Sequence, residues 1–319
     1  MSGKEPSDEA SARATTIAIG NFDGVHRGHR ELVRYAVTEA RRRGFDVEVL
    51  TFDPHPAAVL GKTAPPLLTT TERKVELLQH IDPTLRVVVQ RFDREFSRLS
   101  DREFVETVLL GRMHARQVVV GSNFHFGSDR SGNPRVLADL GRELGFDAHT
   151  FELSGDRSGI FSSTRVREAI AAGDLALAAE ILGRWHALSG CVVRGDGRGH
   201  QLGFPTANLE EIAELLPPPG IYACLADPLA PPDSFAAPMK AVVHIGPRPA
   251  VNRGFSVEVH ILDGDYALYG RRLRVHLVAR IRAVSDFANL EQLREQIGSD
   301  VASARRILGQ LGVATKVVR

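Results

Sequence analysis

This sequence of 319 residues lacks the features that mark several common classes of protein. Cysteine occurs only at Cys191 and Cys224, too few for a disulfide framework, and no Cys/His spacing is typical of a zinc site. No run of about 18 apolar residues is present, so we expect no membrane-spanning segment. The formal net charge is +1, which gives no electrostatic reason to expect a nucleic-acid or membrane partner.

The N-terminal segment, residues 1–14, is polar and lacks the apolar stretch of a secretory signal. We therefore expect a short disordered head on a cytoplasmic protein. The composition, 43% hydrophobic and 25% charged, is ordinary for a soluble globular protein, and the length favours two domains. Neither property decides the oligomeric state, so a homo-oligomer stays open.

Strand and helix patterns alternate over residues 15–183, which we predict to be the first domain. The predicted strands are residues 15–19, 46–51, 85–89, 117–120 and 148–153. Helical patterns separate them, and the first of these ends at Gly44, a glycine suited to a C-cap. Such alternation predicts a doubly wound parallel sheet, in which ligands bind beyond the carboxyl ends of the strands.

A glycine-rich turn leads from the first strand into the first helix. Its residues of interest are Gly20, Phe22, Asp23, Gly24, His26 and His29, the histidines forming the pattern H-x-G-H. Glycines let the backbone approach a phosphate, and the N–H groups at a helix N-terminus point at it. Imidazoles donate to phosphate oxygens and can carry positive charge. These residues alone also fit a structural turn with surface histidines.

Two polar clusters follow later strands of the same domain. Asn123 comes after residues 117–120 and can orient a ribose or a phosphate. Ser163, Thr164 and Arg165 open a helix, where a hydroxyl, backbone N–H groups and a guanidinium suit a triphosphate. Because each cluster follows a strand, we expect them to converge with the histidines on one crevice. Taken singly, each cluster fits a capping or turn role equally well.

The spacing of the apolar residues changes after Gly183, and we predict a second domain over residues 184–319. Short β patterns divided by proline and glycine turns indicate a small closed antiparallel barrel, and a last helical pattern would pack on it. The strand patterns are residues 187–193, 221–225, 240–245, 256–262 and 273–278, and the helical pattern is residues 290–311.

Two neighbouring stretches of the second domain suit nucleotide phosphates. Gly195, Gly197 and Gly199 form a turn whose backbone N–H groups can wrap phosphates. The hydroxyl of Thr206 and the amide oxygen of Asn208 can hold Mg²⁺ beside those phosphates, since Mg²⁺ takes few protein oxygens. A lone Thr-x-Asn pattern is also common in plain turns.

Glu258 places one carboxylate inside the alternating apolar run 256–262. A carboxylate in that position is a candidate general base for a substrate hydroxyl. The alternation by itself favours the other interpretation, an ordinary strand residue that faces outward.

Several of these stretches resemble one family. Residues 20–29, 51–56, 123–127 and 162–167 are similar, in order and spacing, to the FMN adenylyltransferase module of the bacterial bifunctional FAD synthetases. Residues 199–209, with the Pro-Thr-Ala-Asn run intact, resemble the riboflavin kinase module of that family. The resemblance covers about residues 15–312.

The resemblance implies an enzyme of FAD biosynthesis with two activities. Riboflavin would be phosphorylated by ATP to FMN, and FMN would be adenylated to FAD with release of pyrophosphate. It implies that His26 and His29 serve adenylyl transfer at the ATP phosphates. It further implies that Thr206 and Asn208 bind Mg²⁺ and ATP phosphates, and that Glu258 is the base acting on the ribityl hydroxyl.

A few positions depart from the family pattern. Phe161 stands where the family usually has Ile, residues 245–250 lack two usual threonines, and Ala267 stands where Asp is common. The last two departures lie on the expected flavin side of the kinase half. They leave open an enzyme with adenylyltransferase activity only, or one that acts on a flavin analogue. A non-enzymatic flavin-binding protein is a further alternative, although it would predict loss of five residues that are all present, His26, His29, Thr206, Asn208 and Glu258.

Overall fold

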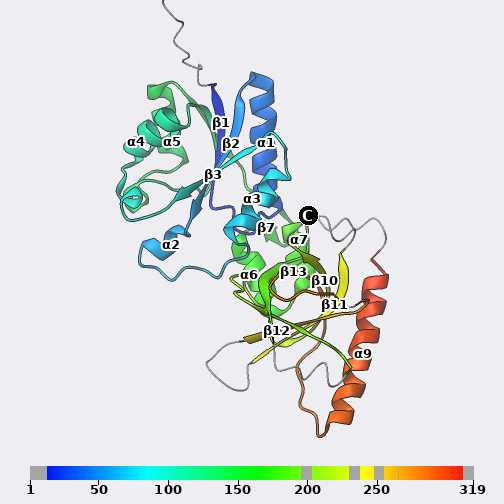
Figure 1. Cartoon of the computed structure of the whole chain (residues 1–319). Helices are drawn as coiled ribbons and strands as arrows, with labels where there is room; N and C mark the ends of the chain where they lie inside the picture. Colours follow the sequence, from blue (N-terminus) through cyan, green and yellow to red (C-terminus); the bar gives the residue numbers. More distant parts are fainter. Residues whose placement is uncertain (1–12, 195–202, 230–237, 248–254, 265, 312–319) are drawn as a thin grey trace, which may run out of the picture. The chain divides into compact units, whose positions relative to one another are not determined.

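The computed structural model describes residues 13–194, 203–229, 238–247, 255–264 and 266–311. The chain divides into two compact units, residues 1–65 with 71–161 and residues 66–70 with 162–319, which are described separately below (Figure 1). Across the described ranges, none of the helices combines the length and apolar character that crossing a bilayer requires.

A five-stranded sheet with the order β3-β2-β1-β4-β5 forms the centre of the first unit. All neighbouring strands pair in parallel, which confirms the predicted doubly wound sheet. The strands are β1 Thr15–Ile19, β2 Asp46–Asp53, β3 Arg86–Arg91, β4 Ala115–Gly121 and β5 Asp147–Phe151. The central strands are buried on both faces, which is why their sequences are nearly continuous apolar runs.

Helices cover both faces of this sheet. α1 and α3 pack with Ala18, Val49 and Val119 on one face, whereas the π-helical segment η2 and α5 pack with Ile17 and Val118 on the other. The helical elements are α1 Arg27–Arg43, α2 Pro56–Val59, α3 Thr71–Gln79, α4 Asp101–Glu103, η2 Phe104–Arg112 and α5 Pro134–Leu144. Short 3₁₀ turns, η1 Phe96–Arg98 and η3 Ser128–Arg130, and a small hairpin, β6 Gly155–Asp156 with β7 Gly159–Ile160, complete the unit.

The sequence signals for helix ends are confirmed where the capping geometry is clear. Gly44 ends α1 in the left-handed region at φ +70°, where a side chain would be strained. The pattern Ser-x-x-Glu at Ser100 forms a capping box before α4, because the hydroxyl of Ser100 accepts from the backbone N–H of Glu103 and the Glu103 carboxylate accepts from the backbone N–H of Ser100. These local contacts fix where the helices begin and end.

The second unit is built on a closed antiparallel barrel with the strand order β10-β11-β12-β9-β8-β13. The strands are β8 Ala187–Val193, β9 Ala207–Glu210, β10 Gly220–Pro228, β11 Met239–Pro247, β12 Phe255–Ile261 and β13 Arg272–Arg282. The predicted barrel is confirmed, but the sequence patterns do not predict β9, which has only four residues. Alternate residues such as Val257 and Val259 point into the barrel core.

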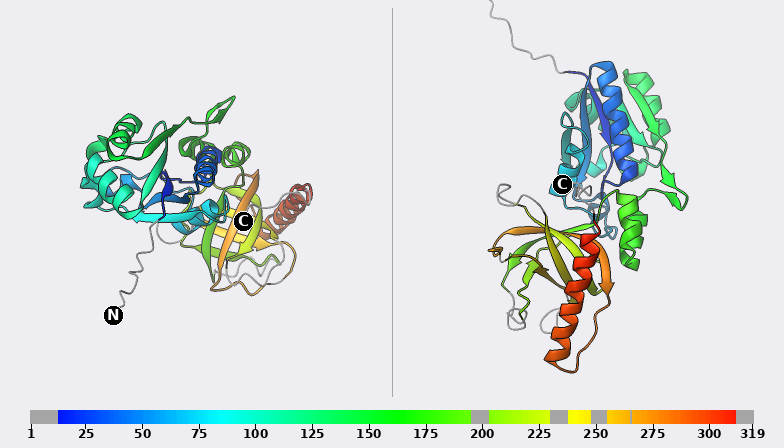
Figure 2. Two further views of the ribbon diagram at one scale, coloured as in Figure 1. Left: turned by 90° about the horizontal axis from the view of Figure 1, so that it is seen from above. Right: turned by 90° about the vertical axis from the view of Figure 1, so that its right-hand side faces the viewer.

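In the described part of the second unit three helices accompany the barrel: α6 Ser163–Ala172, α7 Leu175–Leu182 and α9 Leu290–Gly309. α9 lies along the barrel, as Figure 2 shows, and buries Ala304 and Leu308 against Ile221 and Val242. α7 packs on β13, and Leu175 joins the barrel core. In the division into compact units α6 and α7 therefore go with the barrel, while a functional boundary after Gly183 stays a prediction.

Candidate active sites

The turn after β1 has a constrained backbone. Phe22 and Val25 have φ values of +50° and +39°, which L-residues other than glycine rarely adopt, and Gly24 lies at φ +81°. Both side chains are buried, with about 1% of their surface exposed, so packing holds the unusual conformation. Because a β-branched residue is especially disfavoured here, the turn is strained at the position predicted to receive phosphate.

The two histidines of the H-x-G-H pattern lie together at the start of α1. His26 is the N-cap residue, and its Nδ1 accepts from the backbone N–H of His29 over 3.3 Å. A neutral His26 ring then carries its proton on Nε2. The two rings are stacked with centroids 3.5 Å apart, and the Phe22 ring meets His29 edge-on at 5.2 Å. The two imidazoles therefore lie side by side at the N-terminus of α1, an arrangement suited to binding an anion.

The strand next to β1 contributes a second polar group at the same edge. The hydroxyl of Thr51 in β2 donates to the carbonyl of Asn21 over 3.0 Å. The side chains of Asn21 and His55 lie 3.3 Å apart, and His55 caps α2 by accepting from a backbone N–H. Asp53 accepts from the hydroxyl of Thr71 over 2.8 Å. The turn after β1 and the segment after β2 are therefore joined by hydrogen bonds.

Asn123 follows β4 on the other side of β1. Its carbonyl is bonded to the ring of His125 over 3.0 Å, and its amide oxygen lies close over Gly121, where a Cβ would be 3.3 Å away. Since β2, β1 and β4 are adjacent and parallel, the segments that follow them meet at one edge of the sheet. The convergence predicted for this part of the site agrees with the topology, whereas nucleotide binding by Gly20, Asp23 or Asn123 stays a prediction.

The Ser-Thr-Arg segment begins α6, as predicted, but α6 belongs to the second compact unit. Ser162 is its N-cap and accepts from the backbone N–H of Arg165 over 3.2 Å. Phe161 is the last residue of the first unit. A Cβ added to Gly28, the glycine of the H-x-G-H pattern, would be 3.4 Å from the Phe161 Cβ, and the centroid of the Phe161 ring lies 4.6 Å from the Arg27 guanidinium carbon. Triphosphate binding by Ser163, Thr164 and Arg165 stays a prediction.

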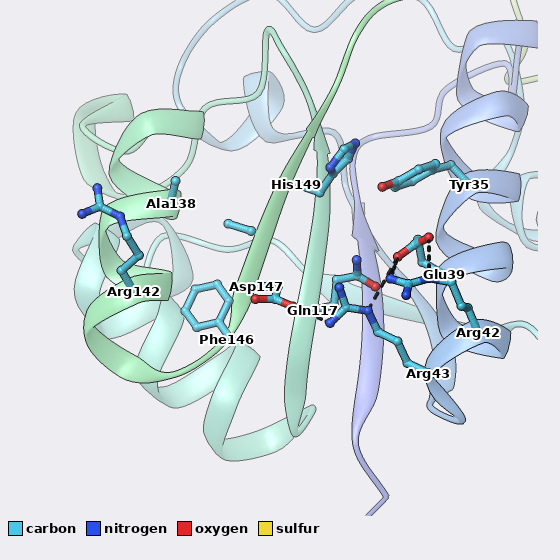
Figure 3. Close-up of a pocket in the computed structure, with 11 residues that line it drawn as sticks. Tyr35, Glu39, Arg42, Arg43, Gln117, Ala138, Arg142, Phe146, Asp147 and His149 are labelled. Atoms are coloured by element: carbon cyan, nitrogen blue, oxygen red, sulfur yellow. Dashed lines mark hydrogen bonds and ion pairs between the residues drawn. The ribbon is translucent and has the colours of Figure 1, made fainter.

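A separate hollow of about 620 Å³ lies between α1, β4, β5 and α5 (Figure 3). Gln117 and Asp147 line it near the amino ends of their strands, whereas the histidine turn follows the carboxyl end of β1. Its charged side chains are paired: Arg43 binds Asp147, and hydrogen bonding from Arg42 lowers the pKa of Glu39 to about 2. We assign no ligand to this hollow.

In the second unit, the barrel register brings two of the predicted residues together. Asn208 in β9 pairs directly with Glu258 in β12, so both side chains lie on the same face of the sheet. The neighbours of Glu258 in its strand point into the core, so Glu258 faces outward, as the alternation alone predicted. Glu258 is nevertheless placed beside the amide assigned to the metal, which the sequence pattern does not reveal.

Two histidines that sequence analysis did not select flank this pair. His244 in β11 is the partner of Glu258 on its other side, with Nδ1 3.9 Å from a carboxylate oxygen. His260 bonds the carbonyl of Pro205 through Nδ1 over 2.8 Å and so anchors the residue before Thr206. His260 also packs edge-on against Phe204 at 5.6 Å. The sequence could have indicated His260, because it lies two residues after Glu258 in the same alternating run and therefore on the same face of the strand.

Some predicted residues fall outside the described ranges. Gly195, Gly197 and Gly199 lie there, as do residues 248–250 of the stretch 245–250 that departs from the family pattern. Gly246 is described, and it lies against the His244 ring so closely that a Cβ would come within 2.7 Å of Nε2. Ala267 is exposed.

Comparison with known proteins divides the chain into two consecutive matches. The family model described as FAD synthetase matches residues 8–165, and the model described as riboflavin kinase matches residues 182–308. The bifunctional riboflavin kinase/FMN adenylyltransferase of Escherichia coli (strain K12) is 38% identical over 306 residues, covering 94% of this chain and 95% of the relative. The protein of the same name from Bacillus subtilis (strain 168) is 30% identical over 305 residues, covering 93% of each. A solved structure named as a macrolide-efflux protein from Streptococcus pneumoniae is similar with a TM-score of 0.80 at 27% identity, covering 93% of this chain and 96% of that chain.

Proposed function

This chain belongs to the family of bifunctional riboflavin kinase/FMN adenylyltransferases, and we propose on that premise that it makes FAD from riboflavin in two ATP-dependent steps. The barrel unit phosphorylates riboflavin to FMN and releases ADP. The parallel-sheet unit joins FMN to the AMP part of a second ATP and releases pyrophosphate. Both substrates of each step are small molecules.

In the first step Glu258 accepts the proton of the ribityl hydroxyl as its oxygen bonds to the γ-phosphorus of ATP. The bond between that phosphorus and the bridging oxygen to the β-phosphate breaks, and ADP leaves with the electron pair. A primary alcohol is a poor nucleophile at neutral pH, so a positioned base raises the rate. The direct pairing of Glu258 with Asn208 supports this role, because it puts the base beside the group assigned to the phosphates.

Thr206 and Asn208 are the residues we assign to Mg²⁺ in the barrel. Their hydroxyl and amide oxygens are hard ligands of the kind Mg²⁺ prefers, and phosphate oxygens and water would supply its other ligands. The described residues contain no group of three or more His, Cys, Asp or Glu side chains that could hold a metal by themselves. When bound, Mg²⁺ neutralises phosphate charge, while the protein residues orient the nucleotide.

In the second step a phosphate oxygen of FMN attacks the α-phosphorus of ATP, and pyrophosphate leaves. The protein forms no covalent bond to the substrates in this step, and it accelerates the reaction by positioning them and by stabilising the charge on the phosphates. His26 and His29, stacked at the N-terminus of α1, stabilise the phosphates. Asn123 and the Gly20–Gly24 turn position the nucleotide from the same edge of the sheet, and Ser163, Thr164 and Arg165 bind the triphosphate.

The observation that carries this proposal is that two different family models match the chain in succession, and that each match contains its own polar cluster. The test is chromatography of the products formed from riboflavin, ATP and Mg²⁺ by the full chain. FAD is the expected product. Formation of FMN alone would exclude adenylyl transfer. If the protein makes no FMN from riboflavin but makes FAD when FMN is added, it is an adenylyltransferase only. Absence of both products would contradict the enzyme assignment.

A further inference from the structure

One buried lysine binds the two backbone segments that meet at the adenylyl-transfer edge of the sheet. Lys74 in α3 donates through Nζ to the carbonyl of Asn21 over 3.2 Å and to the carbonyl of Phe52 over 3.0 Å. Asn21 belongs to the turn after β1, and Phe52 belongs to β2. Only 6% of Lys74 is exposed, which is unusual for a residue type that normally keeps its ammonium in water.

The charge of Lys74 is held in an unfavourable environment. Burial lowers the pKa of its ammonium, and the carboxylates of Asp23 and Asp53 partly oppose that shift. A buried cation is retained in a fold only where hydrogen bonds and nearby charges compensate its lost hydration. The position of Lys74 is therefore tied to the two carbonyls that accept from it and is favoured by the negative charge of Asp23 and Asp53.

The bond to Asn21 bears on the strained turn through one peptide plane. Rotating the peptide between Asn21 and Phe22 changes ψ of Asn21 and φ of Phe22 together, and it swings the Asn21 carbonyl away from Lys74. Such a rotation would relieve the φ of +50° at Phe22. The hydrogen bonds from Lys74 and from the hydroxyl of Thr51 both end on this carbonyl, and both oppose the rotation.

The Phe22 ring transmits this constraint to the histidines. It packs edge-on against His29 at 5.2 Å, and it lies under Gly20, where a Cβ would be 3.1 Å from the ring. His29 in turn is stacked on His26. A change in the Asn21–Phe22 peptide would move the ring that supports the His29 imidazole.

We propose that Lys74 is a positioning residue for adenylyl transfer, which holds the Asn21 carbonyl and thereby fixes the imidazoles of the H-x-G-H turn. This inference rests on the proposed function of the parallel-sheet unit. Lys74 acts through the turn and is not assigned any contact with substrate. Displacement of a catalytic group by a fraction of its own size is enough to slow a reaction severely, because rate depends steeply on alignment.

The test compares Lys74→Met, which keeps the length of the side chain and removes its donors, with Lys62→Met, an exposed lysine of the same unit. We expect Lys74→Met to lower kcat for pyrophosphate release from FMN and ATP by about 10-fold or more. KM values should stay within about threefold, and ADP release from riboflavin and ATP should be unchanged. Lys62→Met should retain both activities.

Thr51→Val provides an independent test, because it removes an uncharged donor to the same carbonyl with little change in volume. We expect Thr51→Val to lower kcat for pyrophosphate release. In the double variant that carries Thr51→Val and Lys74→Met, the fold-reduction of kcat should differ from the product of the two single fold-reductions. A folded Lys74→Met variant with normal kcat for pyrophosphate release would overturn the inference. If Lys74→Met does not fold, a folded Thr51→Val variant with normal kcat would overturn it. Absence of pyrophosphate release in the wild-type enzyme would instead refute the proposed function.

Discussion

Replacing Glu258 by Gln tests the assignment of the kinase base. Gln keeps the size and the hydrogen-bonding reach of the side chain but cannot take a proton from the ribityl hydroxyl. The strand pairing with Asn208 and His244 depends on backbone bonds, so the barrel should keep its register in the variant. The change therefore isolates proton transfer from folding.

The expected loss follows from the surroundings of the carboxylate. Removal of a general base lowers a rate by about 10²- to 10⁴-fold. The Glu258 side chain is 36% exposed, so water can accept the proton in its place, and the His244 ring is 3.9 Å from the carboxylate. We therefore expect the lower part of the range, about 10²- to 10³-fold in kcat, or about 2.7 to 4.1 kcal/mol of transition-state stabilisation.

The assay measures ADP release with riboflavin and, in parallel, pyrophosphate release with FMN. Pyrophosphate release should be unchanged, because none of the residues assigned to adenylyl transfer lies in β12 or in the strands β9 and β11 that pair with it. Glu210→Gln is the matched control, since Glu210 lies two residues from Asn208 on the same strand. Near-normal ADP release by Glu258→Gln would show that Glu258 is an ordinary strand residue. An equal loss in Glu210→Gln would refute the reasoning from register.

Three further predictions concern the histidines, the metal and a buried carboxylate. His29→Ala should lower pyrophosphate release by about 10²-fold or more while ADP release continues, and equal loss of both activities in a folded variant would contradict the separation of roles. Chelation by EDTA should stop both half-reactions until Mg²⁺ is restored, and stoichiometric zinc in an elemental analysis would contradict the assignment of hard oxygen ligands. Burial raises the pKa of Glu214, so the folded barrel binds this proton more tightly than the unfolded chain does. Stability should consequently fall as pH rises from the ordinary carboxyl pKa through the raised one. Glu214→Gln, which can still accept from the Ser189 N–H, should show a smaller fall in melting temperature as pH rises above the ordinary carboxyl pKa.

The sequence alone determined the order and type of the main elements. The parallel strands are buried on both faces, so their apolar runs are visible in the sequence, and the face of α1 that contains Leu32 and Val33 follows the helical period. Helix ends were readable at Gly44 and Ser100, because capping uses residues adjacent in the chain. The H-x-G-H pattern was readable for the same reason.

The tertiary structure decided which distant residues meet. The four residues of β9 are too few for a periodic signal, so the pairing of Asn208 with Glu258 appears only when the barrel closes and sets the register. The association of α6 and α7 with the barrel likewise depends on packing that no local pattern encodes.

Lys74 is the clearest case of a role that only the fold could assign. In a helical pattern a lysine is normally read as exposed, and the apolar positions of α3 gave no reason to place it inside. It is buried because the carbonyls of Asn21 and Phe52 converge on Nζ, and those residues are 53 and 22 positions away in the chain. The positive φ values of Phe22 and Val25 have the same origin, since local preference opposes them and only tertiary packing holds them.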